Sequence, residues 1–94
     1  MFDIKVDDNK HIILSGRLDA SQVDKANSVL NLISESSLID FADLEYISSA
    51  GMGLLLAVHK RLSESGHKLK LRNLNNHIND VFHYAGFDRI FEIE

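Results

Sequence analysis

Two adjacent serines, Ser48 and Ser49, are the residues of this chain best placed to do chemistry. They lie between a short apolar run and a long helical pattern, and the glycines Gly51 and Gly53 follow them directly. Hydroxyl groups at a strand-to-helix turn can supply a nucleophile, cradle a phosphate or cap the helix. The surrounding residues help to separate these alternatives.

A nucleophilic role for Ser49 is not favoured. The nucleophile motif G-x-S-x-G needs a glycine two residues before the serine, where this chain has Ile47. A serine nucleophile also needs a base within hydrogen-bond reach. The chain has five histidines that could serve as this base, and none is expected in a loop beside Ser49. They are His11, His59, His67, His77 and His83. We therefore expect a protein that is not an enzyme.

The chain also lacks the patterns of a phosphate-binding loop and of a metal site. The segment "SSAGMG" has no Lys-Ser or Lys-Thr ending, which a P-loop requires. His77 and His83 are six residues apart, so they fall on different faces of one predicted helix. There is no cysteine, which excludes thiolate ligands and disulfides. We expect no bound metal and no cofactor.

Helix capping is the simplest structural explanation of the serines. Either Ser48 or Ser49 could act as N-cap of the following helix, which would stabilise it by about 1 kcal/mol. A cap needs only one serine, however, and glycines in a first helical turn lower helix propensity. Capping alone therefore leaves one serine and the two glycines unexplained.

Apolar periodicity predicts an α/β fold with the element order ββαβαβαβ. Residues 2–6 and 11–18 read as an antiparallel hairpin across the turn "DDNK", and strands are also expected at 37–41, 67–73 and 88–94. Helices are expected at about 19–34, 50–64 and 74–87, the first with an apolar stripe of Val23, Ala26, Leu30 and Ile33. Ser21 and Asp24 resemble a capping box, while Gly66 and Gly86 suit helix ends.

This element order predicts how the loops are arranged. Strand–helix–strand units give parallel neighbours, so we expect a single mixed β-sheet with an antiparallel N-terminal hairpin and parallel strands thereafter. Loops that leave the carboxyl ends of parallel strands open on the same side. The loop around Asp19 and the loop around Ser49 should therefore face solvent together.

Length and charge restrict the class of protein. Ninety-four residues without a linker-like segment predict one domain over residues 1–94. The net charge of −4 and the dispersed basic residues argue against nucleic acid as a partner. No apolar run approaches the roughly 20 residues that span a bilayer, so we expect no membrane insertion. The absence of a leader-like segment and of cysteine favours a cytoplasmic location.

The segment "IDFADLEYISSAGMGLLL" resembles the signature of STAS domains, in particular that of the anti-sigma factor antagonists of bacterial partner-switching systems. The matching positions are Asp40-Phe41, Asp43-Leu44, Tyr46-Ile47 and Ser49-Ala50-Gly51-Met52-Gly53. "SGRLDA" is similar to the Gly-x-Leu-Asp element of that family, with Gly16, Leu18 and Asp19 in place. The expected element order agrees over almost the whole chain and implies the STAS fold.

The resemblance implies that Ser49 is a phosphorylated serine. A serine kinase of the histidine-kinase-like ATPase type, which is also the anti-sigma factor, would phosphorylate it, and a metal-dependent serine phosphatase would reverse the reaction. The unphosphorylated form would bind the kinase or anti-sigma factor. The family commonly has aspartate before the phosphoserine, whereas this chain has Ser48, which is therefore a rival acceptor.

The same resemblance implies a partner-binding surface around the serine. Asp19 would help to present Ser49 to the kinase, and Met52 is either an exposed apolar contact or a core residue. The expected partner-binding residues are Asp19, Ser21, Ser48, Ala50, Gly51, Met52 and Gly53. The alternative function is a constitutive STAS subunit of a lipid-transporting ABC complex, without a phosphorylation cycle.

Overall fold

The computed structural model describes all residues from Met1 to Glu94 and contains one five-stranded sheet in the spatial order β1-β2-β3-β4-β5. The strands are β1 (Phe2–Val6), β2 (Ile12–Leu18), β3 (Ser37–Ile47), β4 (Leu69–Arg72) and β5 (Glu92–Ile93). β1 pairs antiparallel with β2, and every other neighbouring pair is parallel. The predicted α/β class and mixed sheet are confirmed.

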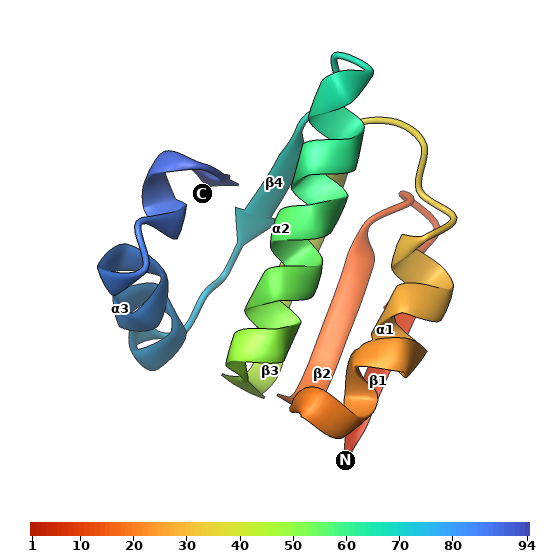
Figure 1. Ribbon diagram of the computed structural model, residues 1–94. Helices are drawn as coiled ribbons and strands as arrows, with labels where there is room; N and C mark the ends of the chain where they lie inside the picture. The colour runs from red at the N-terminus through yellow and green to blue at the C-terminus, as the bar shows by residue number, and fades with distance from the viewer.

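Three α-helices and two short 3-10 turns complete the fold. They are η1 (Ala20–Gln22), α1 (Val23–Leu30), α2 (Ser49–Glu64), α3 (Asn76–Tyr84) and η2 (Phe87–Arg89). The helices α1 and α2 lie side by side over one face of the sheet, with α3 beyond α2 on the side of β4 (Figure 1). None of the helices has the length and the hydropathy that a bilayer-spanning helix needs.

Alternating side chains of the sheet form the core under these helices. In β1 and β2 the inward positions are Phe2, Ile4, Ile12 and Leu14, all buried, whereas Lys5 points outward and is exposed. The buried positions of α2 recur at three- and four-residue steps, as at Leu55, Val58 and Leu62. Each such side chain contributes roughly 1.5–3 kcal/mol on burial, so the period of each element decides which face carries the core.

The third strand is longer than its apolar run predicts. A strand was expected over residues 37–41, but β3 continues to Ile47 because the register of its pairing with β2 shifts twice, between Ile13 and Ser15 and between Gly16 and Arg17. Between the two shifts Gly16 pairs with Leu44, and after the second Leu18 pairs with Ile47. Residues 42–47, which lie outside the predicted strand, therefore belong to β3, and Ser48 follows directly after the strand.

Gly16 is required at the second of these shifts. Its φ is 83°, and a Cβ atom at this position would overlap the carbonyl oxygen of Met1. That oxygen accepts a hydrogen bond from the amide of Arg17 at 2.8 Å. A glycine permits both the left-handed conformation and the close approach, which explains the glycine of "SGRLDA".

The start of α1 differs from the predicted capping box. Asp19 Oδ1 accepts hydrogen bonds from the Ser21 amide at 3.0 Å and from the Ser21 hydroxyl at 2.6 Å, so these residues cap η1. α1 begins at Val23, and its N-cap Gln22 makes no side-chain cap bond. The capping-box prediction was wrong because Asp19, which lies closer in sequence, takes both Ser21 donors.

Of the other predicted helix and strand ends, some are confirmed and others are wrong. Gly66 and Gly86 have positive φ and directly follow α2 and α3 with their C-caps, as expected. The first helix stops at Leu30, short of residue 34, and Arg61 of α2 donates to the carbonyls of Leu30 (2.9 Å) and Ile33 (2.6 Å). The strand expected over 88–94 is reduced to β5, since residues 87–89 form η2.

Asp40 is the one buried charged residue, with 8% of its surface exposed, and it ties β3 to β4. It accepts hydrogen bonds from the Ala42 amide (2.8 Å), Asn73 Nδ2 (3.1 Å) and Arg72 Nε (3.1 Å). Burial alone would raise the pKa of Asp40, but these donors outweigh it and hold the pKa below its ordinary value. The folded state therefore favours the ionised carboxylate.

We expect Asp40→Asn to lower the free energy of unfolding by about 2 kcal/mol at pH 7, because it removes hydrogen bonds to a charged group. The folded pKa is depressed, so this stabilisation is fully present above the unfolded pKa of about 3.9 and disappears as pH falls through the folded value. Urea unfolding of both proteins at a series of pH values measures the difference. Asp8→Asn, at an exposed residue with no ion pair, is the control. A difference that stays constant down to the acid limit would contradict this role.

Gly51 and Gly53 should respond oppositely to substitution by alanine. A Cβ on Gly51 would lie 2.9 Å from Leu18 Cγ and 2.9 Å from Ile47 Cγ1, whereas a Cβ on Gly53 would meet nothing within 4 Å. We expect Gly51→Ala to cost about 1–3 kcal/mol through overpacking. Gly53→Ala should add roughly 0.5–1 kcal/mol through helix propensity. Urea midpoints measure both changes, and equal shifts of the same sign would show that the contact at Gly51 is not tight.

Candidate functional site

Ser48 and Ser49 have different structural roles at the start of α2. Ser48 is the N-cap: its backbone is extended, and its Oγ accepts a hydrogen bond from the Gly51 amide at 3.1 Å. Ser49 is the first residue of the helix and is exposed, and its hydroxyl is bonded to no other protein group. Of the two capping alternatives, the structure therefore selects Ser48 and leaves the Ser49 hydroxyl free.

The ends of β2 and β3 bring this turn beside the Asp19 loop. The Ser48 amide donates to the Leu18 carbonyl at 2.9 Å, and the Ser48 carbonyl accepts from the Met52 amide at 2.9 Å to open the helix. The start of α2 and the η1 turn after β2 consequently lie at the same end of the sheet (Figure 1). The expectation that the Asp19 and Ser49 loops face the same side is confirmed.

Asp19 contributes a carboxylate to this end of the sheet. The hydrogen bond from the Ser21 hydroxyl is the main reason that the pKa of Asp19 lies below its ordinary value; the Ser21 amide, Arg17 and the N-terminal amino group act in the same direction, and desolvation opposes them. The side chain is thus ionised at neutral pH. Ser21, itself exposed, positions this carboxylate.

Burial divides the remaining predicted site residues into two groups. Ala50 and Gly53 are exposed, whereas Gly51 is buried against Leu18 and Ile47. Met52 is 8% exposed and belongs to the core, so the expectation of an exposed apolar contact was wrong and its alternative as a core residue holds. Met52 is buried because it lies three residues before Leu55, on the helix face that packs on the sheet.

We call the accessible part of this region the serine edge. It consists of Asp19, Ser21, Ser49, Ala50 and Gly53; Asp19 is half-buried, as is Ser48 beneath them, and the other four residues are exposed. It presents one free hydroxyl, one carboxylate and two small helical residues. No histidine forms a hydrogen bond with either serine: the His11 ring lies 3.8 Å from the Asp7 carboxylate, and the rings of His67 and His83 bond to Ser36 and Asp88. The arrangement therefore offers an accessible hydroxyl to which no histidine is hydrogen-bonded.

Arg17 and Tyr46 border the serine edge and were not identified from the sequence. They pair in register on β2 and β3, and the Arg17 guanidinium carbon lies 4.4 Å from the centre of the Tyr46 ring. Each immediately precedes a buried residue of its strand, Leu18 or Ile47. Alternation along the two strands was the signal available, but only the register of the bulged pairing brings the two side chains together.

The sequence matches known proteins over nearly its full length. Residues 3–92 match the family described as "Mlab, STAS domain". BtrV of Bordetella bronchiseptica, named as a candidate anti-sigma factor antagonist, is 36% identical over 74 residues, which cover 79% of this chain and 58% of BtrV. The chain thus spans little more than half of that relative. The anti-sigma-B factor antagonist of Listeria monocytogenes is 28% identical over 98 residues, covering 98% of this chain and 86% of the relative.

Solved structures share the fold. A crystal structure of a candidate anti-sigma factor antagonist from Thermotoga maritima has a TM-score of 0.80 and 25% identity, covering 99% of this chain and 85% of its own. The Bacillus cell fate determinant SpoIIAA, in its phosphorylated form, has a TM-score of 0.72 at 18% identity and covers 100% of this chain and 91% of its own. Together with the match over residues 3–92, this common fold shows that the chain belongs to the STAS domain family.

Proposed function

We propose that this STAS domain is a protein-binding regulator of the anti-sigma factor antagonist type, switched by phosphorylation of Ser49. The observation on which the proposal rests is that Ser48 and Ser49 have different structural roles. Ser48 holds the helix N-terminus, so the exposed hydroxyl of Ser49 is free for modification without loss of the cap. The names of the relatives from Bordetella and Listeria support the class of function.

The electrostatics of the serine edge suit a switch that changes the surface and leaves the fold intact. A phosphoserine carries a charge of about −1.5 to −2 at pH 7. At the N-terminus of α2 the helix dipole favours that charge by roughly 0.3–1 kcal/mol. The structural relative SpoIIAA has been solved in phosphorylated and unphosphorylated forms, which supports a fold that tolerates the modification.

The partner of the unphosphorylated form is, on this proposal, an anti-sigma factor that is also the serine kinase, of the histidine-kinase-like ATPase type. A metal-dependent serine phosphatase restores the hydroxyl. The partner covers the serine edge, where Ala50 and Gly53 let its backbone approach the helix closely. A phosphate on Ser49, close to the ionised Asp19, would have to be desolvated in that interface, and this cost abolishes binding.

A second candidate function is a constitutive STAS subunit of a lipid-transporting ABC complex. The observation in its favour is the description of the matching family, which carries the name Mlab and not that of an anti-sigma factor antagonist. In this role the domain binds an ATPase subunit without a phosphorylation cycle. The state of Ser49 in the cell separates the two candidates.

Phosphopeptide mapping by mass spectrometry should find phosphate on Ser49 in protein isolated from its native cell. We expect Ser49→Ala to abolish the modification with little change in stability, because Ser49 is exposed and its hydroxyl forms no hydrogen bond within the protein. Ser48→Ala should keep the modification but lose about 1 kcal/mol of stability with the cap. Phosphate on Ser48 would move the acceptor by one residue. No phosphate under any growth condition would reject the switch in favour of the ABC subunit.

Ser49→Asp should weaken binding to the ATPase-type partner by roughly tenfold or more, equivalent to at least about 1.4 kcal/mol. The unfolding free energy should stay within about 1 kcal/mol of wild type, since a carboxylate at a helix N-terminus is tolerated or stabilising. Calorimetric titration with that partner, isolated with the wild-type protein, measures the affinity. The matched control is Ser63→Asp, which places the same charge on an exposed residue near the other end of α2. Equal weakening by both variants would contradict a binding surface at the serine edge.

A further inference from the structure

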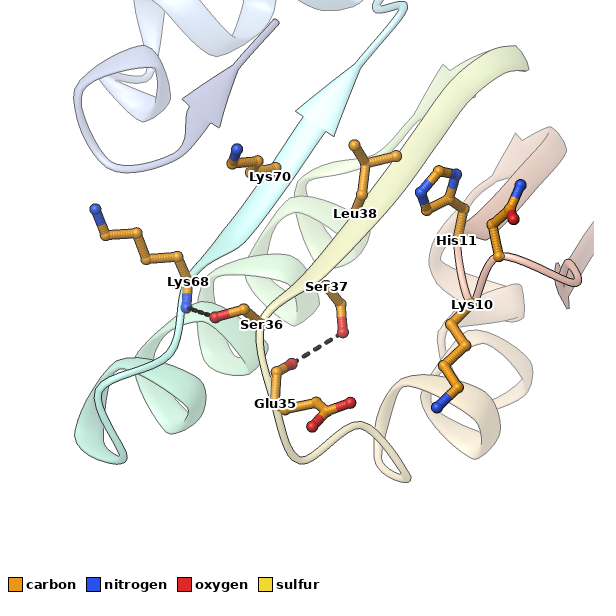
Figure 2. Close-up of a pocket in the computed structure, with 9 residues that line it drawn as sticks. Lys10, His11, Glu35, Ser36, Ser37, Leu38, Lys68 and Lys70 are labelled. Carbon is orange, nitrogen blue, oxygen red and sulfur yellow. Dashed lines mark hydrogen bonds between the residues drawn. The ribbon is translucent and has the colours of Figure 1, made fainter.

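A hollow of about 430 Å³ lies on the sheet, and Figure 2 shows the residues that line it. Its walls come from the turn between β1 and β2, the segment that opens β3 and the start of β4. β3, of 11 residues, begins at the hollow and ends next to Ser48, so the two regions lie at opposite ends of this strand. The volume is within the range of about 300–1,000 Å³ that is usual for small-molecule sites.

The walls of this hollow concentrate positive charge in an acidic protein. Lys10, Lys68 and Lys70 line it, which is half of the six lysines of a chain with net charge −4, and Glu35 is its one carboxylate. Lys70 is paired with Glu92 at 3.0 Å, outside the lining, and this partner raises the pKa of Lys70. The ammonium groups of Lys10 and Lys68 form no ion pair within the protein. These two cations are unneutralised, and their side chains must turn inward to reach an anionic ligand in the hollow.

The backbone of the first wall is held rigidly. Asp7 Oδ1 accepts hydrogen bonds from the amides of Asn9 (2.8 Å) and His11 (2.9 Å), and the Asp7 carbonyl accepts from the Lys10 amide (3.0 Å). These bonds keep Lys10 at φ 63°, a conformation that is uncommon for a residue other than glycine, asparagine or aspartate. The hairpin turn between β1 and β2 therefore fixes where Lys10 lies at the edge of the hollow.

Hydrogen bonds also join the other two walls. The Ser36 hydroxyl accepts from the Lys68 amide at 2.9 Å, and the Ser37 amide donates to the Lys68 carbonyl at 3.1 Å. In Figure 2 the Lys10 and Lys68 side chains extend outward from the rim. Their flexible four-carbon stems are the parts of the hollow that must move to meet a ligand. The site therefore combines a hydrogen-bonded polar backbone with two lysines whose side chains can change position.

The lining indicates the chemical class of the ligand. The Ser37 hydroxyl donates to the Glu35 carbonyl at 2.9 Å and the Ser36 hydroxyl accepts from the Lys68 amide, so each oxygen keeps acceptor capacity for a hydroxylated molecule, as the ring of His11 can also provide. Leu38 is the only apolar side chain of the lining. No Phe, Tyr or Trp lines the hollow to stack on a planar base. Lysine ammonium groups bind phosphate as compact point charges. We propose that this hollow binds a small, soluble, hydroxylated phosphate ester of the sugar phosphate class.

The proposal is tested by titrating the whole, isotopically labelled protein with glucose 6-phosphate and following its amide NMR signals. We expect saturable binding with a Kd of about 1 mM or tighter, and shifts confined to residues 9–11, 35–38 and 68–70. Glucose should cause no shifts, and inorganic phosphate should bind more weakly. Vesicles of phosphatidylglycerol, whose headgroup offers the same phosphate chemistry, should not bind.

Charge variants show whether the lysines of the hollow are responsible. Lys10→Gln combined with Lys68→Gln should weaken binding roughly tenfold. The matched control is Lys5→Gln combined with Lys60→Gln, which removes the same charge from exposed residues outside the hollow and should leave the affinity unchanged. Thermal unfolding of both double variants checks that the fold is retained, since none of the four side chains is buried.

Several results would overturn this site. They are no saturation by glucose 6-phosphate, equal affinity for inorganic phosphate, equal weakening by the control variant, or binding to the vesicles alone. None of the variants alters the serine edge. A failure here therefore leaves the proposed phosphorylation switch untouched, and a failure of the switch leaves this site untouched.

Discussion

The first turn of α2 docks onto the ends of β2 and β3, and the serine edge depends on this contact. Gly51 lies so close to Leu18 and Ile47 that no larger residue fits without movement. The hydrogen bond from the Ser48 amide to the Leu18 carbonyl fixes the same junction from the backbone side. Since interiors are close-packed, a contact of this kind sets the height and direction of the helix start. The exposure of Ser49 follows from it.

This contact separates the stabilising residues of the turn from the accessible ones. Gly51 and Met52 face the sheet and Ser48 caps the helix, so these three residues stabilise the turn. Ser49 and Gly53 face solvent and contribute little to stability. A charge added to the second group changes what the surface can bind, while the core beneath it is unaffected. Such a separation is what a surface switch requires, because modification must not unfold the protein.

Much of the fold could be predicted because burial imposes a period on each element. The alternation of residues 2–6 and the spacing of Val23, Ala26 and Leu30 identify a strand and a helix correctly. Prediction was weaker where pairing with another strand decides the structure. The extension of β3 to Ile47 and the reduction of the last strand to two residues depend on register and neighbours, which no local pattern contains. The start of α1 was misplaced because two competing caps lie within a few residues.

The sequence by itself determined the order of the elements, the polar turn that carries the serines, and the resemblance to STAS domains, since these follow from residue type and spacing along the chain. Only the tertiary structure decided which serine is free, that Met52 is a core residue, and that Arg17 stacks on Tyr46. The hollow lined by Lys10, Lys68 and Lys70 likewise exists only once three distant segments meet at one end of the sheet. The physical reason is common to all of these features. Exposure, packing and the distances between charges depend on how the helices and strands are arranged in three dimensions. Around the serines, the register of β2 on β3 and the close approach at Gly51 determine that arrangement.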